Sequence, residues 1–99
     1  MQFIVAEKHS THGLLLVITD EDILGKRFEE GKRQLDLSAK FYHGEQKTKE
    51  DVKTLIHKAR HLHLTGKHII AVAIELDVVH PNNILWVGGV PHAQVVGGE

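Results

Sequence analysis

Cysteine is absent from the sequence, and aromatic residues are few: three phenylalanines, one tyrosine and one tryptophan among 99 residues. Without cysteine the chain can form no disulfide bond, no thiolate metal site and no thiolate nucleophile. An excess of one sign of charge is also lacking, because 12 lysines and arginines stand against 13 acidic residues. No overall field therefore attracts the chain to nucleic acid, and electrostatic binding would need a local patch.

Long apolar runs are missing as well. The longest, residues 69–74 and 14–18, are far shorter than the ~20 residues that a membrane-spanning helix needs. Residues 1–6 carry no basic group and are followed by Glu7, so they lack the pattern of a secretory leader. We therefore expect a cytoplasmic protein with no membrane contact.

Length and composition predict one domain over residues 1–99. A chain of this size can enclose one modest core. Its 41% hydrophobic and 25% charged residues are ordinary for a soluble globular protein. The last residues, 95–99, are expected to be a flexible C-terminal tail, and the oligomeric state is left open.

Histidine is unusually frequent, with nine residues in the chain. Because its charge changes near neutrality, the net charge of the protein would rise as the pH falls through ~6.5. Two pairs have the spacing of metal ligands, His9 with His12 in a predicted loop and His57 with His61 on a predicted helix. Neither pair has a third ligand close by, so we predict no metal site and no cofactor.

The chain begins with the pattern of a hairpin. Residues 2–6 and 14–19 are rich in valine, isoleucine and leucine, and a longish polar loop that closes on a glycine separates them. A very short helix is expected at 19–25, with acids in its first turn. Asp20 and Asp22 could act as paired catalytic carboxylates, but the helix start explains them more simply.

A second hairpin is predicted around Gly31. Its tip carries four cations, and the following segment, 34–38, alternates so that Leu35 and Leu37 point inward from a strand. The four cations are Lys26, Arg27, Lys32 and Arg33.

The clearest element is a helix predicted from about Lys49 to Leu64, which Thr48 can cap. One side is an apolar stripe that faces the core. The other side is a basic ribbon that could lie along phosphates, or could be an ordinary solvated helix face. The ribbon consists of Lys49, Lys53, His57, Arg60 and His61. A second helix is expected at 67–76, where the periodicity alone does not exclude a strand.

The closing segment, residues 84–94, is a strand followed by a Gly-Gly-Val-Pro-His-Ala-Gln motif. Two glycines permit backbone conformations closed to other residues, and proline then fixes φ before the histidine. We predict a binding loop in which His92 is presented, although the glycines could simply shape a turn with His92 as a capping side chain. Its residues are Gly88, Gly89, Pro91, His92 and Gln94. The sequence does not decide whether the Val90–Pro91 bond is cis.

Three segments together resemble an archaeal family of uncharacterised proteins, domain-of-unknown-function family 424 (DUF424). The segments are 22–31 (Asp-Ile-Leu-Gly-Lys-Arg-Phe-Glu-Glu-Gly), 41–44 (Phe-Tyr-His-Gly) and 88–94 (Gly-Gly-Val-Pro-His-Ala-Gln). The resemblance runs over nearly the whole chain, and 88–94 is its most specific part. His57, His61 and His63 depart from the family pattern, which further weakens a metal site. The resemblance implies an archaeal cytoplasmic protein and raises the expectation of work on RNA or in translation.

These observations predict an α+β fold: one domain with a mainly antiparallel sheet of about four to five short strands, covered by one or two helices. The leading functional hypothesis is an RNA-binding accessory module in translation or RNA processing. Its predicted phosphate contacts are Lys26, Arg27, Lys32, Arg33, Lys53 and Arg60, with backbone donors at Gly88 and Gly89.

Two alternatives stay open. One is an enzyme or small-molecule-binding protein centred on His92, with Lys26, Asp20 or Gln94 as polar neighbours. No nucleophile elbow, Walker loop, dinucleotide fingerprint or zinc-protease helix is present, so we favour binding over catalysis and assign no catalytic residue. The other is a protein–protein interaction module that docks through the 88–94 loop and the tail.

Overall fold

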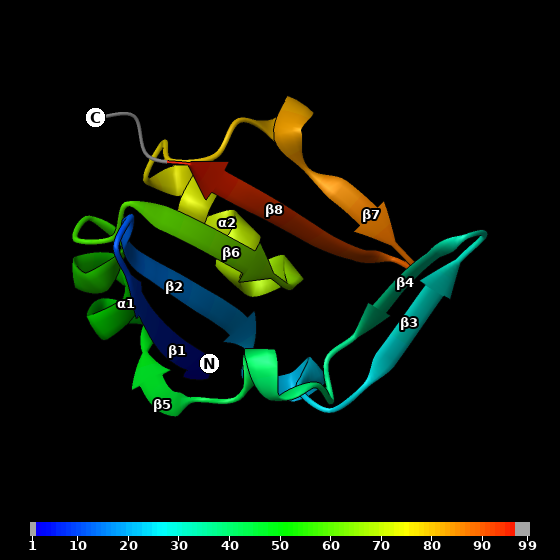
Figure 1. Ribbon diagram of the computed structural model, residues 1–99. Coiled ribbons are helices and arrows are strands. Elements are labelled where there is room, and N and C mark those ends of the chain that lie inside the picture. The colour runs from blue at the N-terminus through cyan, green and yellow to red at the C-terminus, as the bar shows by residue number, and fades with distance from the viewer. Residues whose placement is uncertain (1, 97–99) are drawn as a thin grey trace.

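The structure is a computed structural model, and it describes residues 2–96. Within these residues six strands form one sheet in the order β5-β1-β2-β6-β8-β7, and a separate hairpin, β3 with β4, projects from one end (Figure 1). The strands of the sheet are β1 (Gln2–Ser10), β2 (Gly13–Asp20), β5 (Glu45–Thr48), β6 (His61–Thr65), β7 (Leu85–Val87) and β8 (Val90–Val96). The hairpin consists of β3 (Arg27–Glu30) and β4 (Arg33–Asp36).

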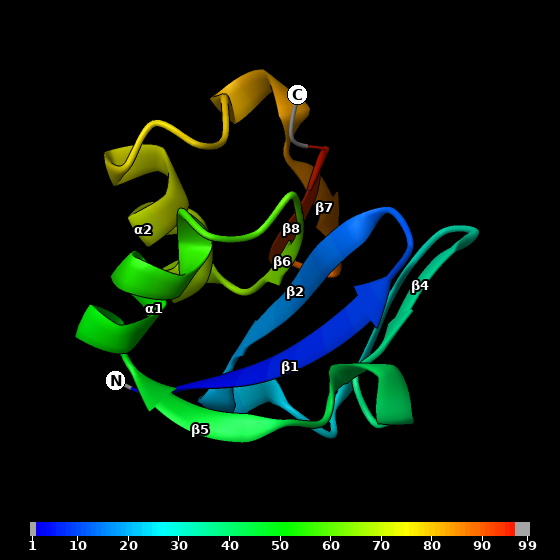
Figure 2. The ribbon, with the colours of Figure 1, turned by 60° about the vertical axis from the view of Figure 1, so that its left-hand side comes forward.

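Two helices, α1 (Lys49–Ile56) and α2 (Lys67–Glu75), lie on the same side of the sheet (Figure 2). Three short 3-10 turns, η1 (Glu21–Ile23), η2 (Lys40–Tyr42) and η3 (Pro81–Asn83), join the larger elements. The main core lies between the helices and the sheet, where alternate strand residues such as Leu16, Ile18 and Leu64 are fully buried. A smaller core under the hairpin contains Leu35 and Leu37.

The α+β class and the predominance of antiparallel pairing are confirmed, since only β2 and β6 run parallel among the neighbours in the large sheet of residues 2–96. The strand count was too low, because the sequence prediction missed β5, β6 and β8. The polar sequence of β5, Glu-Gln-Lys-Thr, has no apolar alternation, so only its pairing with β1 makes it a strand.

The long helix predicted from Lys49 to Leu64 is wrong in its second half. α1 starts as predicted, with a capping box in which the Thr48 hydroxyl accepts from the Asp51 amide, but it ends at Ile56. Residues 61–65 form β6 instead. Their sequence, His-Leu-His-Leu-Thr, alternates with the period of a strand, and the two leucines are buried against the helices. The predicted basic ribbon therefore does not form along one helix, because His57, Arg60 and His61 lie outside α1.

Other local predictions hold. The helix expected at 67–76 forms over residues 67–75, and Leu35 and Leu37 point inward. The first hairpin forms as well, although its turn is only Thr11–His12 and not a longish loop. The predicted tail, 95–99, starts inside β8, where Val95 pairs with Leu62. Its last three residues lie outside the described part of the chain.

Asp20, the last residue of β2, joins the sheet to α2. Its carboxylate accepts hydrogen bonds from the His68 amide at 2.8 Å and the Ile69 amide at 2.9 Å, which are among the free donors at the start of the helix. The sequence prediction assigned Asp20 to the start of the short helix, but it makes no cap bond to η1. Gly66 permits the contact, because a β-carbon there would lie 2.3 Å from Cγ of Asp20.

None of the helices in residues 2–96 is long and apolar enough to cross a membrane.

Replacement of this carboxylate is expected to destabilise the fold strongly. Asp20→Ala leaves two amides without their acceptor in a site that is 1% exposed, so the free energy of unfolding should fall by about 2–4 kcal/mol. Asp22→Ala removes an exposed carboxylate nearby and should change stability by no more than about 0.5 kcal/mol. Urea unfolding of both variants measures the difference, and equal losses would show that Asp20 does not anchor α2.

Candidate functional site

The side of the sheet opposite α1 and α2, here called the helix-free face, carries three rows of side chains across neighbouring strands. The register of β1, β2, β6 and β8 defines these rows, and β7 extends the third. The first row is Lys8, Leu15, His61 and Val96; the second is Ala6, Val17, His63 and Gln94; the third is Ile4, Thr19, Thr65, His92 and Leu85. None of these thirteen positions holds an acidic residue.

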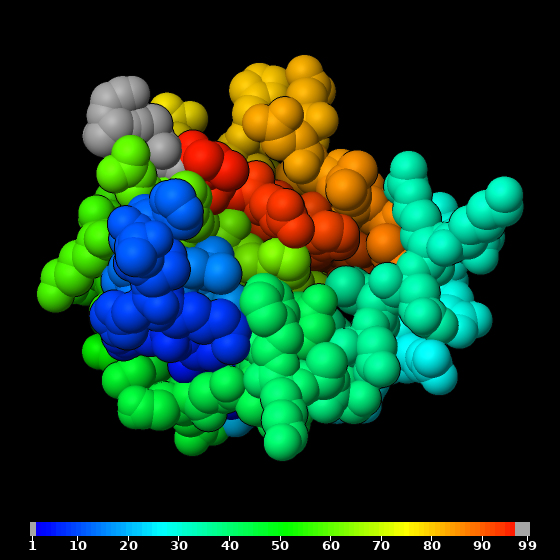
Figure 3. All heavy atoms as spheres, viewed as in Figure 1, coloured from blue at the N-terminus to red at the C-terminus, as the bar shows by residue number. Residues whose placement is uncertain are grey.

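Aromatic side chains of η2 lie over part of this face. Figure 3 shows the face from the front, with the atoms of β8 (red) and of the η2 segment (green) flanking those of β6. The ring of Phe41 packs edge-to-face on Tyr42 and on His63, both with centroids 5.1 Å apart. Nζ of Lys8 lies 5.0 Å from the Phe41 centroid, which is a cation–π distance. Phe41 remains 36% exposed, so one side of this cluster faces solvent.

Two histidines stack at the centre of the face. The rings of His63 and His92 are 5.8 Å apart at an interplanar angle of 18°. Burial, with a smaller effect from His92, lowers the pKa of His63 to about 4. Burial, followed by the charge of Arg33, lowers the pKa of His92. Both imidazoles are therefore neutral at neutral pH, and a neutral ring suits hydrogen bonding and stacking better than the donation of a catalytic proton.

Buried polar atoms surround this pair. Oγ1 of Thr19, Oγ1 of Thr65, Nε2 of His63 and Nδ1 of His92 have no hydrogen-bond partner within the described residues. The other nitrogen of His63, Nδ1, lies 3.4 Å from the amide nitrogen of Gln94. Since buried polar groups are normally paired, this concentration of unpaired atoms marks the face as different from an ordinary core.

A groove runs along the face past the aromatic cluster. One part, of about 230 Å³, is lined by Phe41, His61, His63 and Gln94 with apolar neighbours. A wider cavity of about 780 Å³ adjoins it, because Leu15, His61 and Val96 line both. The wider part also contains the side chains of Arg60 and His12 and the hydroxyl residues Ser10 and Thr11. Neither part is lined by an acidic residue.

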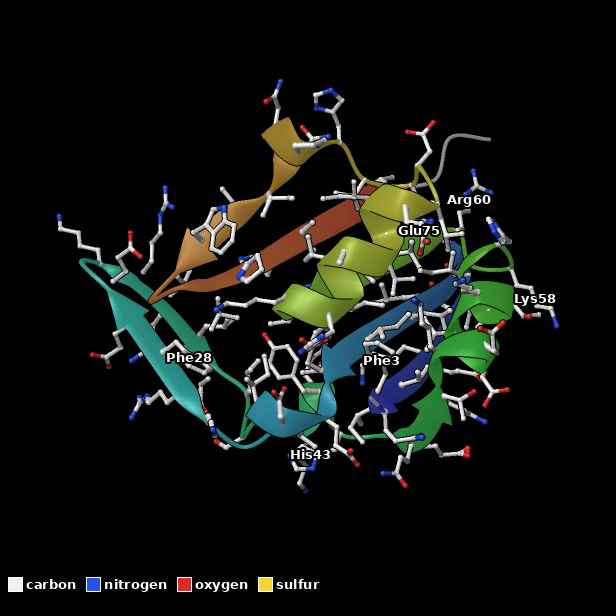
Figure 4. All side chains as sticks on the ribbon, turned by 180° about the vertical axis from the view of Figure 1, so that it is seen from behind. Phe3, Phe28, His43, Lys58, Arg60 and Glu75 are labelled. Carbon is white, nitrogen blue, oxygen red and sulfur yellow. The ribbon has the colours of Figure 1, made fainter. Side chains whose placement is uncertain are left out.

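The predicted phosphate contacts do not form one surface. Lys26, Arg27, Lys32 and Arg33 belong to the hairpin region at one end of the molecule, whereas α1, which carries Lys53, lies at the other end (Figure 1). Figure 4 likewise shows Arg60 far from Phe28 of the hairpin. Arg60 borders the groove, and the charge of Arg33 lowers the pKa of His92. These two residues therefore lie at opposite ends of the helix-free face.

The Gly-Gly-Val-Pro-His motif is a hairpin turn followed by a strand. Gly88 and Gly89 have φ of 55° and 82°, as a two-residue turn between β7 and β8 requires. The Val90–Pro91 bond is trans, and Pro91 is buried. His92 therefore lies on the helix-free face, within β8, and is not presented by a loop. Gln94 follows it on the same face, whereas the two glycines lie at the end of the sheet.

Sequence reasoning missed most of the helix-free face. His61 and His63 were assigned to a helix, and Thr19, Thr65 and Phe41 were not proposed as site residues. The alternation in residues 61–65 was the available signal, because two histidines separated by one residue share a face only in a strand. Among residues 2–96 no three histidine, aspartate or glutamate side chains are placed to hold one metal ion.

The fold and this face define a class: an α+β protein whose mixed sheet has helices on one side and, on the other, rows of apolar and polar side chains without acidic residues. The chain belongs to the family described as protein of unknown function (DUF424), whose model matches residues 7–97, and this confirms the resemblance noted in the sequence. The fold is similar to that in the crystal structure of an uncharacterized conserved protein from Methanopyrus kandleri, with a TM-score of 0.80 and 21% identity over 100% of this chain and 96% of that chain. No curated protein matches the sequence.

The lowered pKa of His63 predicts a specific loss of stability in acid. The unfolded chain takes up a proton at its ordinary pKa of 6.5, whereas the folded protein takes it up only near pH 4. The free energy of unfolding should therefore fall as the pH drops from about 6.5 to 4. His63→Phe keeps a ring in the stack and should reduce this slope, as urea unfolding at a series of pH values would measure.

Gln94→Leu is the matched control, because it removes the neighbour of His63 and keeps the titrating ring. This variant should retain the slope of the parent protein. Identical slopes for the parent and His63→Phe would show that His63 is not held neutral by the fold.

Proposed function

We propose that the protein binds single-stranded RNA along the helix-free face. The observation that carries this proposal is the charge of the face: a protein with slightly more acidic than basic residues places none of its acids in the three rows or in the groove. Lys8, Arg33, Arg60 and the histidines border the same surface. A polyanion can therefore lie along the groove without meeting a like charge.

The aromatic cluster supplies a surface on which bases can stack. Single-stranded RNA is recognised largely through unstacked bases that pack on aromatic or histidine rings and form hydrogen bonds with nearby polar groups. Phe41 presents a partly exposed ring beside His61 and His63, and the amide of Gln94 can both donate to and accept from a base edge. This combination along one groove suits RNA better than a protein partner.

Cations at the two ends of the face suit the sugar–phosphate chain. Arg60 and His61 line the wide part of the groove, and Ser10 and Thr11 there offer hydroxyl groups to ribose. Arg33 lies toward the hairpin end. This arrangement keeps two of the six phosphate contacts predicted from sequence on the path, adds Lys8, and leaves Lys53 on the other side of the sheet.

The role within a cell follows from the same proposal. A single domain of this size with one binding face suits an accessory module that accompanies RNA in translation or processing. The family resemblance and the similar fold from Methanopyrus kandleri support an archaeal setting for such a role.

Loss of the exposed aromatic ring is expected to weaken RNA binding. Phe41→Ala removes one stacking surface, worth about 1–3 kcal/mol, so the Kd for a fluorescent single-stranded RNA of mixed sequence should rise about tenfold. Trp86→Ala is the control, because Trp86 is 50% exposed but faces the helix side of β7, opposite the buried Pro91. Fluorescence anisotropy measures both, and amide spectra check that the variants remain folded.

If Trp86→Ala weakens binding as much as Phe41→Ala, the RNA lies on the other side of the sheet. If single-stranded DNA of the same sequence binds as tightly as RNA, the ribose contacts are absent. Failure of the parent protein to bind any RNA at low salt would overturn the proposal.

The dependence of RNA affinity on salt should identify the cations on the path. Each lost phosphate contact lowers the slope of log Kd against log salt by about 0.7 for a single strand. Arg33→Ala and Arg60→Ala should each show this decrease, whereas Lys53→Ala on α1 should leave the slope unchanged. A decrease for Lys53→Ala alone would favour the surface predicted from sequence over the helix-free face.

A further inference from the structure

A separate cavity of about 320 Å³ lies at the end of the sheet, where the β7–β8 turn, the β3–β4 hairpin and the start of α2 meet. Two of the segments that carry the family resemblance converge here. The amide of Gly88 donates to Oε1 of Glu30 at 3.0 Å, and a β-carbon on Gly88 would lie 3.3 Å from Cβ of Phe28. The hairpin thus packs closely on the glycine turn and closes one side of the cavity.

The wall of the cavity is partly apolar. Ile23, Phe28 and Val90 line it, and all three also belong to or pack on the smaller core, so their positions are fixed. Figure 4 shows Phe28 on the hairpin in the view that has α2 in front. A volume of about 320 Å³ lies at the lower end of the usual range for small-molecule sites, which suits a compact metabolite.

Opposite charges face this cavity without pairing with each other. Asp22, next to the sheet end, and Lys67, the first residue of α2, both line it, and neither forms a salt bridge within residues 2–96. Asp20 also borders the cavity, but its two oxygens are already engaged by the amides of α2. One carboxylate and one ammonium are therefore available in the lining of a cavity whose wall is partly apolar.

We propose that this cavity binds a free α-amino acid with an apolar side chain. The α-ammonium group of the ligand pairs with Asp22, and its α-carboxylate pairs with Lys67. The side chain packs on Ile23, Phe28 and Val90. A zwitterion is the chemical class that satisfies both charges at once, and neither a simple amine nor a simple carboxylate does so. This site is independent of RNA binding on the helix-free face.

The test is an amide-shift titration of the labelled protein with L-leucine and three analogues, each of which lacks one feature. Isoamylamine lacks the carboxylate, 4-methylpentanoate lacks the ammonium, and glycine lacks the side chain. Leucine should give saturable shifts at Gly88, Gly89 and Lys67 with a Kd in the range of about 0.1–1 mM, and each analogue should bind at least about tenfold more weakly.

Two charge variants assign the contacts. Asp22→Asn and Lys67→Met should each weaken leucine binding about tenfold, and both residues are exposed, so the fold should persist. Glu75→Gln and Lys49→Met are matched controls on exposed helix positions and should leave the affinity within about twofold.

Three outcomes would overturn the proposal. One is the absence of saturable shifts around the cavity at about 20 mM leucine, far above the expected Kd. Another is equal binding of leucine and an analogue that lacks either charge. The third is a leucine affinity that both charge variants leave unchanged.

Discussion

The contact between the Asp20 carboxylate and the first amides of α2 is the point on which the rest of the arrangement depends. The pairing of β2 with β6 ends at Thr19 and Thr65, and Asp20 and Gly66 are the next residues after this pair. The carboxylate thus ties the end of β2 to the helix that leaves β6. Burial raises the pKa of Asp20 more than its two amide bonds and the nearby His68 lower it, so the fold accepts an electrostatic cost at this position. The cost is offset by the fixed position of α2 over the core.

The parallel pairing of β2 with β6 then determines both faces of the sheet. In the observed register Leu62 and Leu64 point to the helices, while His61 and His63 point to the helix-free face. A shift of one residue would exchange the two sets and bury imidazoles against α1 and α2. The hydrophobic core thereby enforces the grouping of histidines that defines the candidate site, even though the histidines contribute little to that core.

Some elements are determined by interactions between residues that are close in the sequence, and local sequence patterns were sufficient to predict these elements. The capping box at Thr48, the first hairpin and the second helix follow from neighbouring residues, and the structure has them where they were expected. β6 could not be recognised in this way, because Leu62 continues the apolar stripe of a helix equally well. What decides between the two conformations is the pairing of β6 with β2 and β8, which are distant in the sequence. The candidate site was mispredicted for the same reason. Whether His61 and His63 lie on one face depends on whether a helix or a strand carries them.

The β3–β4 hairpin links the helix-free face to the cavity at the end of the sheet. Phe28 lines the cavity, and its partner across the hairpin is Leu35 in the smaller core. On the second strand of the hairpin, the charge of Arg33 lowers the pKa of His92. Val90 packs under the hairpin, and His92 lies two residues further along the same side of β8. The basic residues of the hairpin are exposed, whereas its buried side chains fix its position on the sheet. Because Leu35 and Leu37 fix the hairpin on the sheet, they hold Phe28 and Arg33 in place together, and both candidate sites require the same small core.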